Sequence, residues 1–372
     1  MHRFSPGLFG VQCPEPFYNL DISTGILPEF VLKDQLLDSL TSINCDSCWF
    51  EVLSELCCRC RLAQQAESKK ALDFACLYQY TVINLAGILA GEYSEYIIMK
   101  LDPIFPKNQT PTDLKPEWVD LGFKFGEKGA HTSRTIMLAE LSGLLHQCPA
   151  TASRPDYVRA LIEDNCLGKH TLSTRKLTLQ RLSELYALDP DVTLFRLMRV
   201  LWDSDEKARP LLALLAGLAR DPLLRATAPV IIAMNEGEEI ARQKMTEALR
   251  DAVEGRLNES ILDKVVRNTA SSWTQSGHLE GRSRKRRLKV KPTPASTTFA
   301  LILGYMLGLR GKSLFDTLFA RVLDSDENEL TFLAMDAKRL GLLDIKSSGG
   351  MTVVSFDTLL KDQERRRIHG TN

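Results

Sequence analysis

The chain has 372 residues, a length that predicts two or three compact domains instead of one. Apolar residues make up 44% and charged residues 25% of the sequence, which excludes a chain that is disordered throughout. Its 47 basic residues are balanced by 47 acidic ones, so the chain as a whole lacks the basic excess that indicates nucleic-acid binding. Such a function would have to depend on a local concentration of charge.

The chain shows no sign of a membrane or secretory segment. The N-terminal residues lack the continuous apolar core of a secretory signal, and the longest apolar stretches, 211–218 and 299–309, are too short to span a bilayer. Nine cysteines, an odd number spread over a long chain, are typical of reduced thiols. We therefore expect a cytoplasmic protein with no membrane partner.

Five of the cysteines are clustered near the N-terminus. They are Cys45, Cys48, Cys57, Cys58 and Cys60. Four thiolates are enough for a tetrahedral zinc site. The segment 48–66, however, has apolar residues at helical spacing, and cysteine packs well as a small apolar side chain. The sequence favours helix packing over zinc at this cluster and leaves the zinc alternative open.

The first part of the chain predicts a helical N-terminal domain of unknown role over residues 1–100. Amphipathic runs of helical length and period occupy 30–40, 48–66 and 71–89. Residues 101–125 are expected to form a connector, because their first fifteen residues hold three prolines among polar residues.

Residues 126–240 predict a helical core. Thr132 or Ser133 can cap its first helix, which Pro149 stops. Turn-forming residues bound the further helices expected at 155–164, 173–187, 192–202 and 209–219.

Two of these helices have the outline of a helix-turn-helix, with a turn at 165–170 that contains Gly168. The start of the second helix is polar and basic, as major-groove docking requires, and its dipole favours phosphate. The candidate DNA contacts there are Thr171, Ser173, Arg175 and Lys176. Ordinary packing in a helical bundle explains the same pattern, and this signal alone favours packing.

A third region, 255–360, predicts a winged-helix-like arrangement. Asn258 can cap a helix that ends at Gly277, and Ser272 and Gln275 are candidate DNA contacts on its last turns. An extended basic run follows, in which seven of the ten residues 282–291 are basic and none is acidic. These seven candidates for phosphate binding are Arg282, Arg284, Lys285, Arg286, Arg287, Lys289 and Lys291. A solvated basic loop or a contact with an acidic protein is the alternative.

The C-terminal part repeats this outline without the charge. A helix near 327–340 precedes two short strands around Gly349 and Gly350, and the polar tail 361–372 is expected to fray.

The sequence contains no pattern that indicates catalysis. It lacks the phosphate-binding loop, the dinucleotide-binding glycine motif, the nucleophile elbow and the paired histidines of a zinc protease. The six histidines are not at metal-ligand spacing. We therefore expect a protein that is not an enzyme and needs no cofactor or metal.

One stretch resembles a known family. The segments YVRALIEDNCLGKHTLSTRKLTLQRLSELYALDP, LLALLAGLARDPLLRATAP and NTASSWTQSGHLEGRSRKRR occur in an order similar to that of the BrxA family of bacterial phage-exclusion (BREX) systems. The resemblance covers about residues 126–295. It implies a winged-helix and helix-turn-helix fold and a DNA-binding accessory role in anti-phage defence. It also implies that Asn165 and Leu167 fill the turn, that Gly277 and Leu279 end the late helix, and that 282–287 form the wing.

The sequence therefore predicts a mainly α protein with short β-hairpin wings. The expected function is non-catalytic binding of double-stranded DNA in a BREX-like defence system, with other proteins of a defence complex as possible partners. The alternative is a helical scaffold or adaptor that holds protein partners without nucleic acid.

Overall fold

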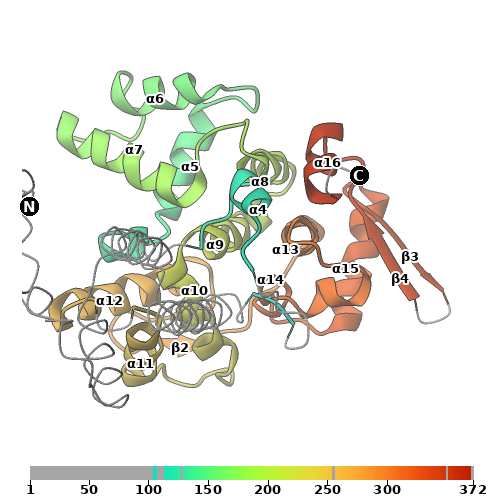
Figure 1. Cartoon of the computed structure of the whole chain (residues 1–372). Coiled ribbons are helices and arrows are strands. Elements are labelled where there is room, and N and C mark those ends of the chain that lie inside the picture. Colours follow the sequence, from blue (N-terminus) through green and yellow to red (C-terminus); the bar gives the residue numbers. More distant parts are fainter. Residues whose placement is uncertain (1–103, 107–112, 126–128, 254–255, 349–350, 370–372) are drawn as a thin grey trace, which may run out of the picture. The chain divides into compact units, whose positions relative to one another are not determined.

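In the computed structural model the chain divides into two compact units, Met1–Ile88 and Leu89–Asn372. The structure describes residues 104–106, 113–125, 129–253, 256–348 and 351–369, all in the second unit. The predicted N-terminal helices and the five clustered cysteines lie outside the described residues. The described part is mainly helical with short antiparallel hairpins, which confirms the mainly α fold class (Figure 1).

The elements follow one another with short connections. The helices are α4 (Pro116–Asp120), α5 (Leu138–Gln147), α6 (Arg154–Ile162), α7 (Leu172–Tyr186), α8 (Thr193–Ser204), α9 (Arg209–Arg220), α10 (Pro222–Ile232), α11 (Arg242–Val253), α12 (Glu259–Gln275), α13 (Pro294–Met306), α14 (Leu318–Arg321), α15 (Glu327–Arg339) and α16 (Asp362–His369). The strands are β1 (Leu279–Glu280), β2 (Arg286–Arg287), β3 (Asp344–Ser348) and β4 (Met351–Ser355).

Two helices form the centre of the described unit. Every residue of α9 from Leu211 to Arg220 and every residue of α13 from Ala295 to Met306 is buried, as expected of helices that are apolar on all sides. The two pack against each other and against α8. Helices α8 and α9 come from the predicted region 126–240 and α13 from 255–360, so the two regions share one hydrophobic core.

Helices α6 and α7 follow the predicted pattern closely. Ser153 and Asp156 form a capping box at the start of α6, and Thr171 Oγ1 accepts a hydrogen bond from Thr174 N at 3.2 Å at the start of α7. The turn between them uses left-handed backbone at Asn165 and Gly168. Both helices begin and end within two residues of the predicted bounds.

The first helix of the core begins later than the sequence predicts. Neither Thr132 nor Ser133 caps it: the segment Ala130–Thr132 forms a short 3-10 turn, and α5 begins at Leu138. Contacts with α12 hold the intervening residues in place, because Ile136 N donates to Ser272 Oγ at 2.9 Å. A long-range contact has therefore overridden the local capping signal.

Helices α10 and α11 were not predicted. The carboxylate of Asp221 caps α10, with Oδ1 accepting from Leu223 N at 3.0 Å and Leu224 N at 3.1 Å. Pro229 lies inside α10, where a proline usually indicates the end of a helix. The strong cap and the burial of the apolar face outweigh that signal.

The long helix α12 confirms the predicted caps at both ends. Asn258 Oδ1 accepts from Ile261 N at 2.9 Å, and Gly277 has a φ of 88° just after the helix. The following hairpin is shorter than predicted: β1 pairs antiparallel with β2 over two residues each, and Leu288 and Val290 lie outside the strands.

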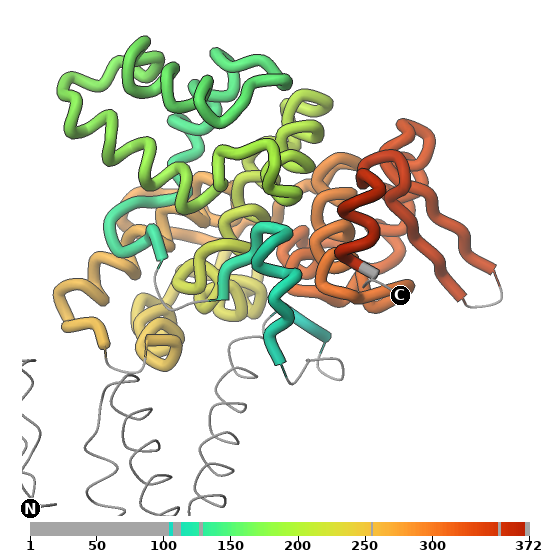
Figure 2. Tube along the Cα trace, turned by 45° about the horizontal axis from the view of Figure 1, so that its top comes forward, coloured from blue at the N-terminus to red at the C-terminus, as the bar shows by residue number. Residues whose placement is uncertain are grey.

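The C-terminal part packs as α13, α14 and α15 followed by the hairpin β3–β4, which projects from the body in both views (Figures 1 and 2). The expectation that the tail frays is wrong for most of its length, because residues 362–369 form α16. Glu364 is buried there and forms an ion pair with Arg196 of α8, whose guanidinium also donates to Leu359 O at 2.9 Å. Among the described residues, no helix combines the length and apolar character needed to cross a bilayer.

Candidate nucleic-acid interface

The basic segment, residues 282–291, is the most concentrated charge in the described structure. Five of its seven bases are exposed, and none of the five side chains makes a hydrogen bond or ion pair with another described residue. They are Arg282, Arg284, Arg286, Lys289 and Lys291. Unpaired cations at this density form a surface that attracts phosphate.

Lys285 is held partly inside the hairpin. Its Nζ donates to Thr274 Oγ1 at 2.7 Å and to Gly281 O at 3.4 Å, and burial lowers the pKa of this amine. Gly281 has a φ of 96°, and a Cβ there would approach the carbonyl oxygen of Arg284 to 2.2 Å. Lys285 and Gly281 therefore set the shape of the loop that carries the exposed bases.

Arg287 is a structural residue and not a DNA contact as predicted. The residue is 2% exposed, and its side chain forms an ion pair with Asp324 and donates from Nε to Ile231 O at 3.0 Å. Asp324 also accepts from Val290 N at 3.0 Å. Asp324, in the turn before α15, thus anchors the basic segment at two points, the side chain of Arg287 and the backbone N–H of Val290.

Acidic residues border the basic segment on the neighbouring strands. Arg286 lies between Glu280 of β1 and Glu239, which forms an isolated antiparallel bridge with it. Glu238 O accepts from Arg287 N at 2.9 Å, which adds this acidic turn to the edge of the hairpin. These carboxylates limit the positive surface along this edge of the hairpin, which favours contact with one phosphate backbone over a broad electrostatic patch.

The two candidate contacts on α12 point into the protein. Ser272 is fully buried, and Gln275 Oε1 accepts from Leu138 N at 3.0 Å while its Nε2 donates to Thr135 Oγ1 at 2.9 Å. The prediction that these residues meet DNA is therefore wrong for this conformation. Their short polar groups instead satisfy the backbone of the segment before α5.

A buried histidine explains the position of Ser272. His131 Nδ1 lies 2.8 Å from Asp221 Oδ2, and its Nε2 lies 2.8 Å from Ser272 Oγ. Burial alone would raise the pKa of Asp221, but the adjacent His131 and backbone N–H groups hold it below its usual value. A serine, a histidine and an aspartate thus stand in hydrogen-bonded order, yet all three are buried and link three distant segments of the core.

The residues at the start of α7 remain on the surface. Thr171, Ser173 and Lys176 are exposed, whereas Arg175 is half-buried and donates from Nη1 to Ile162 O at 3.0 Å. In Figure 1 the α6–α7 pair lies at the top of the view and β2 at the bottom, with α9 and α10 between them. The two predicted contact regions therefore do not form one continuous surface.

His278 is the other buried histidine near the basic segment. Its Nε2 donates to Val322 O at 2.7 Å, and Nδ1 lies 2.9 Å from Ser276 Oγ. Burial lowers the pKa of this imidazole to about 4, with a smaller contribution from Arg287 that is opposed by Asp324. The folded protein therefore holds a neutral imidazole where the unfolded chain would begin to protonate near pH 6.5.

We predict that stability falls as the pH is lowered from about 6.5 to about 4, because only the unfolded chain takes up a proton at His278 in this range. The shift corresponds to about 3 kcal/mol at the low end of the range. The free energy of unfolding, measured with urea at several pH values in this range, should depend less steeply on pH in His278→Gln than in the wild type. Equal slopes in the two proteins would contradict the assignment.

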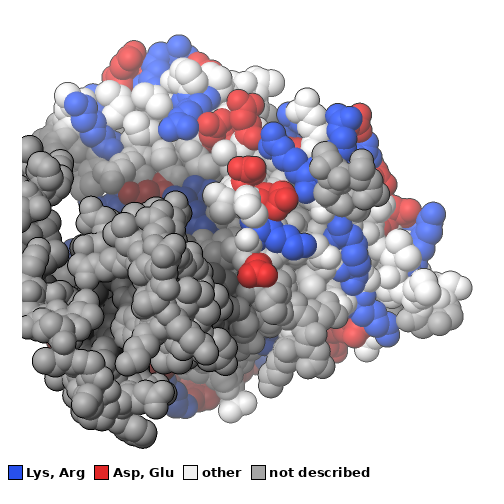
Figure 3. All heavy atoms as spheres, viewed as in Figure 1, with Lys and Arg blue, Asp and Glu red and all other residues white. Residues whose placement is uncertain are grey.

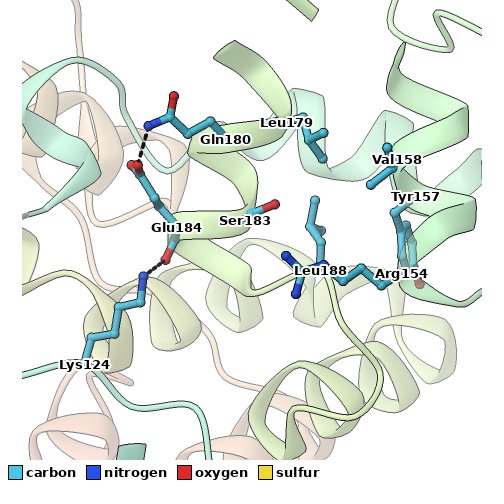
Figure 4. Close-up of a pocket in the computed structure, with 9 residues that line it drawn as sticks. All are labelled: Lys124, Arg154, Tyr157, Val158, Leu179, Gln180, Ser183, Glu184 and Leu188. Carbon is cyan, nitrogen blue, oxygen red and sulfur yellow. Dashed lines mark hydrogen bonds between the residues drawn. The ribbon is translucent and has the colours of Figure 1, made fainter. Parts of the chain in front are cut away.

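A shallow groove lies between α6 and α7 (Figure 4). Its volume is about 390 Å³, and Val158, Leu179 and Leu188 point toward one another across it. Lys124 at its rim donates to Glu184 O at 3.3 Å, and burial together with Arg220 lowers the pKa of this amine. The groove presents no nucleophile beside a base, so its geometry indicates no chemistry.

Charge elsewhere on the visible surface is mixed. In Figure 3, basic and acidic side chains alternate over the described residues instead of forming one field.

Within the described ranges, no three His, Cys, Asp or Glu side chains are placed to hold a metal ion. Burial raises the pKa of the Cys148 and Cys166 thiols, which makes both poor nucleophiles.

Comparison with known proteins adds no relative to these observations. No protein-family model matches the chain, and neither a curated protein nor a solved structure shows significant similarity to it.

Proposed function

We propose that this chain is a DNA-binding accessory protein that contacts the phosphates of duplex DNA through the basic segment. The observation that carries the proposal is the set of five exposed bases within ten residues whose side chains pair with no other part of the described chain. Three of them lie on the β1–β2 hairpin and two directly follow it, and the buried Arg287–Asp324 pair fixes this segment to the core. A rigid support reduces the entropy lost when the cations meet their phosphates.

The proposed binding unit has the outline of a winged helix, with α12 as the helix and β1–β2 as a short wing. Because Ser272 and Gln275 face inward, α12 supplies support and the wing supplies the contacts. Such an interface binds the backbone and reads little sequence. Thr171, Ser173 and Lys176 at the start of α7 would form a second, separate contact, with the helix dipole adding to the attraction for phosphate.

A place in a BREX-like defence system belongs to the same proposal. Its support is the resemblance of the segments in 157–287 to the BrxA family, together with a cytoplasmic location expected from the sequence. On this proposal the protein does no chemistry itself and brings DNA to other proteins of the complex. A scaffold without nucleic acid is the alternative, and the exposed apolar side chains of α15 favour it.

The test is a titration of fluorescent duplex DNA with the wild type and with a variant that changes the five exposed bases to alanine. The matched control changes five other exposed bases to alanine, which removes the same charge: Lys207, Lys346, Lys361, Arg366 and Arg367. We expect the first variant to lose at least about a hundredfold in affinity and the control to stay within a few fold. A folded wild type that does not bind, or equal losses in both variants, would refute the proposal.

A further inference from the structure

The exposed face of α15 carries large apolar side chains that DNA binding does not explain. Five of the ten large apolar side chains exposed in the described residues lie between 332 and 353. They are Phe332, Met335, Leu340, Met351 and Val353. Phe332 is 68% exposed, an unusual position for so large a ring on a protein with no partner.

The buried and exposed sides of α15 are clearly separated. Leu330, Ala334 and Ala337 face the core at helical spacing. Phe332, Met335 and Arg339 repeat at the same spacing on the opposite side. The outer side therefore carries two adjacent apolar side chains followed by a base, and the described part of the chain does not cover them.

The charges along this helix argue against DNA as its ligand. Asp326 is the N-terminal cap of α15, and Glu327 and Glu329 lie in its first turn. In a helix that precedes a wing, this N-terminal end is the part that usually approaches DNA. Three carboxylates there repel phosphate. The bases Lys338 and Arg339 lie at the other end, in the last turn.

This order of charges is complementary to itself. If a second α15 lies antiparallel across the first, with the two-fold axis between Phe332 and Met335, each Phe332 faces the Met335 of the other copy. The same operation brings Glu329 of each copy opposite Arg339 of the other. Lys338 takes no part, because its Nζ donates to Ile345 O at 3.1 Å and pairs with Asp344 of β3 at 2.7 Å. Acids at one end, bases at the other and apolar side chains between them are what an isologous interface requires.

We propose that the outer face of α15 is a homotypic interface, through which two copies of this chain associate antiparallel and two-fold symmetrically. Phe332 and Met335 form its centre, and the two symmetry-related pairs of Glu329 with Arg339 fix its register. Among the described residues Arg339 pairs only with Asp336, at 2.7 Å on an exposed part of the same helix, so this guanidinium loses little by turning to a second copy. The dimer would present two basic segments to DNA.

The experiment is sedimentation of the full chain, without DNA, over a wide range of concentrations. We expect a monomer–dimer equilibrium that Phe332→Asp weakens by at least about 30-fold, the effect of a central interface residue. Val119→Asp, at an exposed apolar residue of α4, is the matched control and should leave the equilibrium unchanged. A wild type that stays monomeric, or a folded Phe332→Asp variant that dimerises as well as the wild type, would overturn the proposal.

Charge exchange tests the register independently of whether Phe332→Asp folds. Glu329→Arg and Arg339→Glu should each weaken self-association, because each places like charges opposite one another. An equimolar mixture of the two variants should form heterodimers at least as readily as the wild type forms homodimers, since opposite charges then meet at both ends. A mixture that associates no better than either variant alone would exclude the antiparallel arrangement.

Discussion

Raising the salt concentration from about 50 to about 200 mM should lower the affinity of the protein for duplex DNA about 500-fold. Each phosphate that a base neutralises contributes about −0.9 to the slope of log affinity against log salt, so five contacts give a slope of about −4.5. The five contributing residues are Arg282, Arg284, Arg286, Lys289 and Lys291. The measurement is a fluorescence titration at four or more salt concentrations.

Single substitutions test how much each base contributes to the salt slope. Arg284→Ala should reduce the magnitude of the slope by about 0.9, whereas Lys285→Ala should change it less, because Lys285 Nζ is already engaged by Thr274. Replacement of Lys346, an exposed base on β3, should leave the slope unchanged. A slope near zero for the wild type, or one that Arg284→Ala does not alter, would contradict phosphate binding by the basic segment.

Asp324→Asn should destabilise the protein by about 3–5 kcal/mol, because it leaves the guanidinium of Arg287 buried without a counter-charge. Asparagine is chosen because Asp324 has a φ of 57°, a conformation that asparagine tolerates and alanine does not. The change therefore removes the charge without adding backbone strain. Urea unfolding at neutral pH measures the difference in free energy of unfolding.

The double variant Arg287→Met with Asp324→Asn tests whether such a loss comes from the unpaired charge of Arg287 or from the other contact of Asp324, with Val290 N. If the cost comes from an unpaired buried charge, removing both charges should recover most of the stability. Arg242→Ala is the control: this arginine pairs with Asp263 on the surface, and its loss should cost less than about 1 kcal/mol. A loss below 1 kcal/mol in Asp324→Asn would show that water reaches the pair.

Local signals in the sequence were sufficient for the helices with strong caps. Asn258 and Gly277 predicted the two ends of α12, and Ser153 and Thr171 now account for the starts of α6 and α7. These signals act within four residues, so they can be recognised without knowing the fold. The same is true of the second hairpin, where a glycine pair separates two short runs that contain the strand-forming residues Ile345, Val353 and Val354.

In the candidate site, the position of the basic run was easier to predict than the direction in which each of its side chains points. The basic run was visible, but nothing in its composition marks Arg287 as the base that points inward. The reason is the pairing of β1 and β2, in which Arg287 lies opposite the buried Leu279 while Arg286 lies opposite the exposed Glu280. A strand of two residues is too short for its alternation to be recognised from sequence.

The inward position of Ser272 depends on residues that are remote in the sequence. It contacts His131, 141 residues away, and His131 in turn contacts Asp221, 90 residues away. No local pattern encodes such contacts. The helix α16 was missed for a similar reason, because its polar sequence is held by the pairing of Glu364 with Arg196 of α8.

The packing of α9 against α13 has a consequence for synthesis of the chain in the cell. Helix α9 is complete at Arg220, but α13 begins only at Pro294, so the ribosome must add the intervening residues before α13 can cover α9. At ordinary translation rates this takes on the order of 5–15 s, during which a helix whose residues 211–219 are all apolar lacks one of its partners. A nascent chain stalled in this interval would be prone to aggregation, and chaperones would be expected to bind it there.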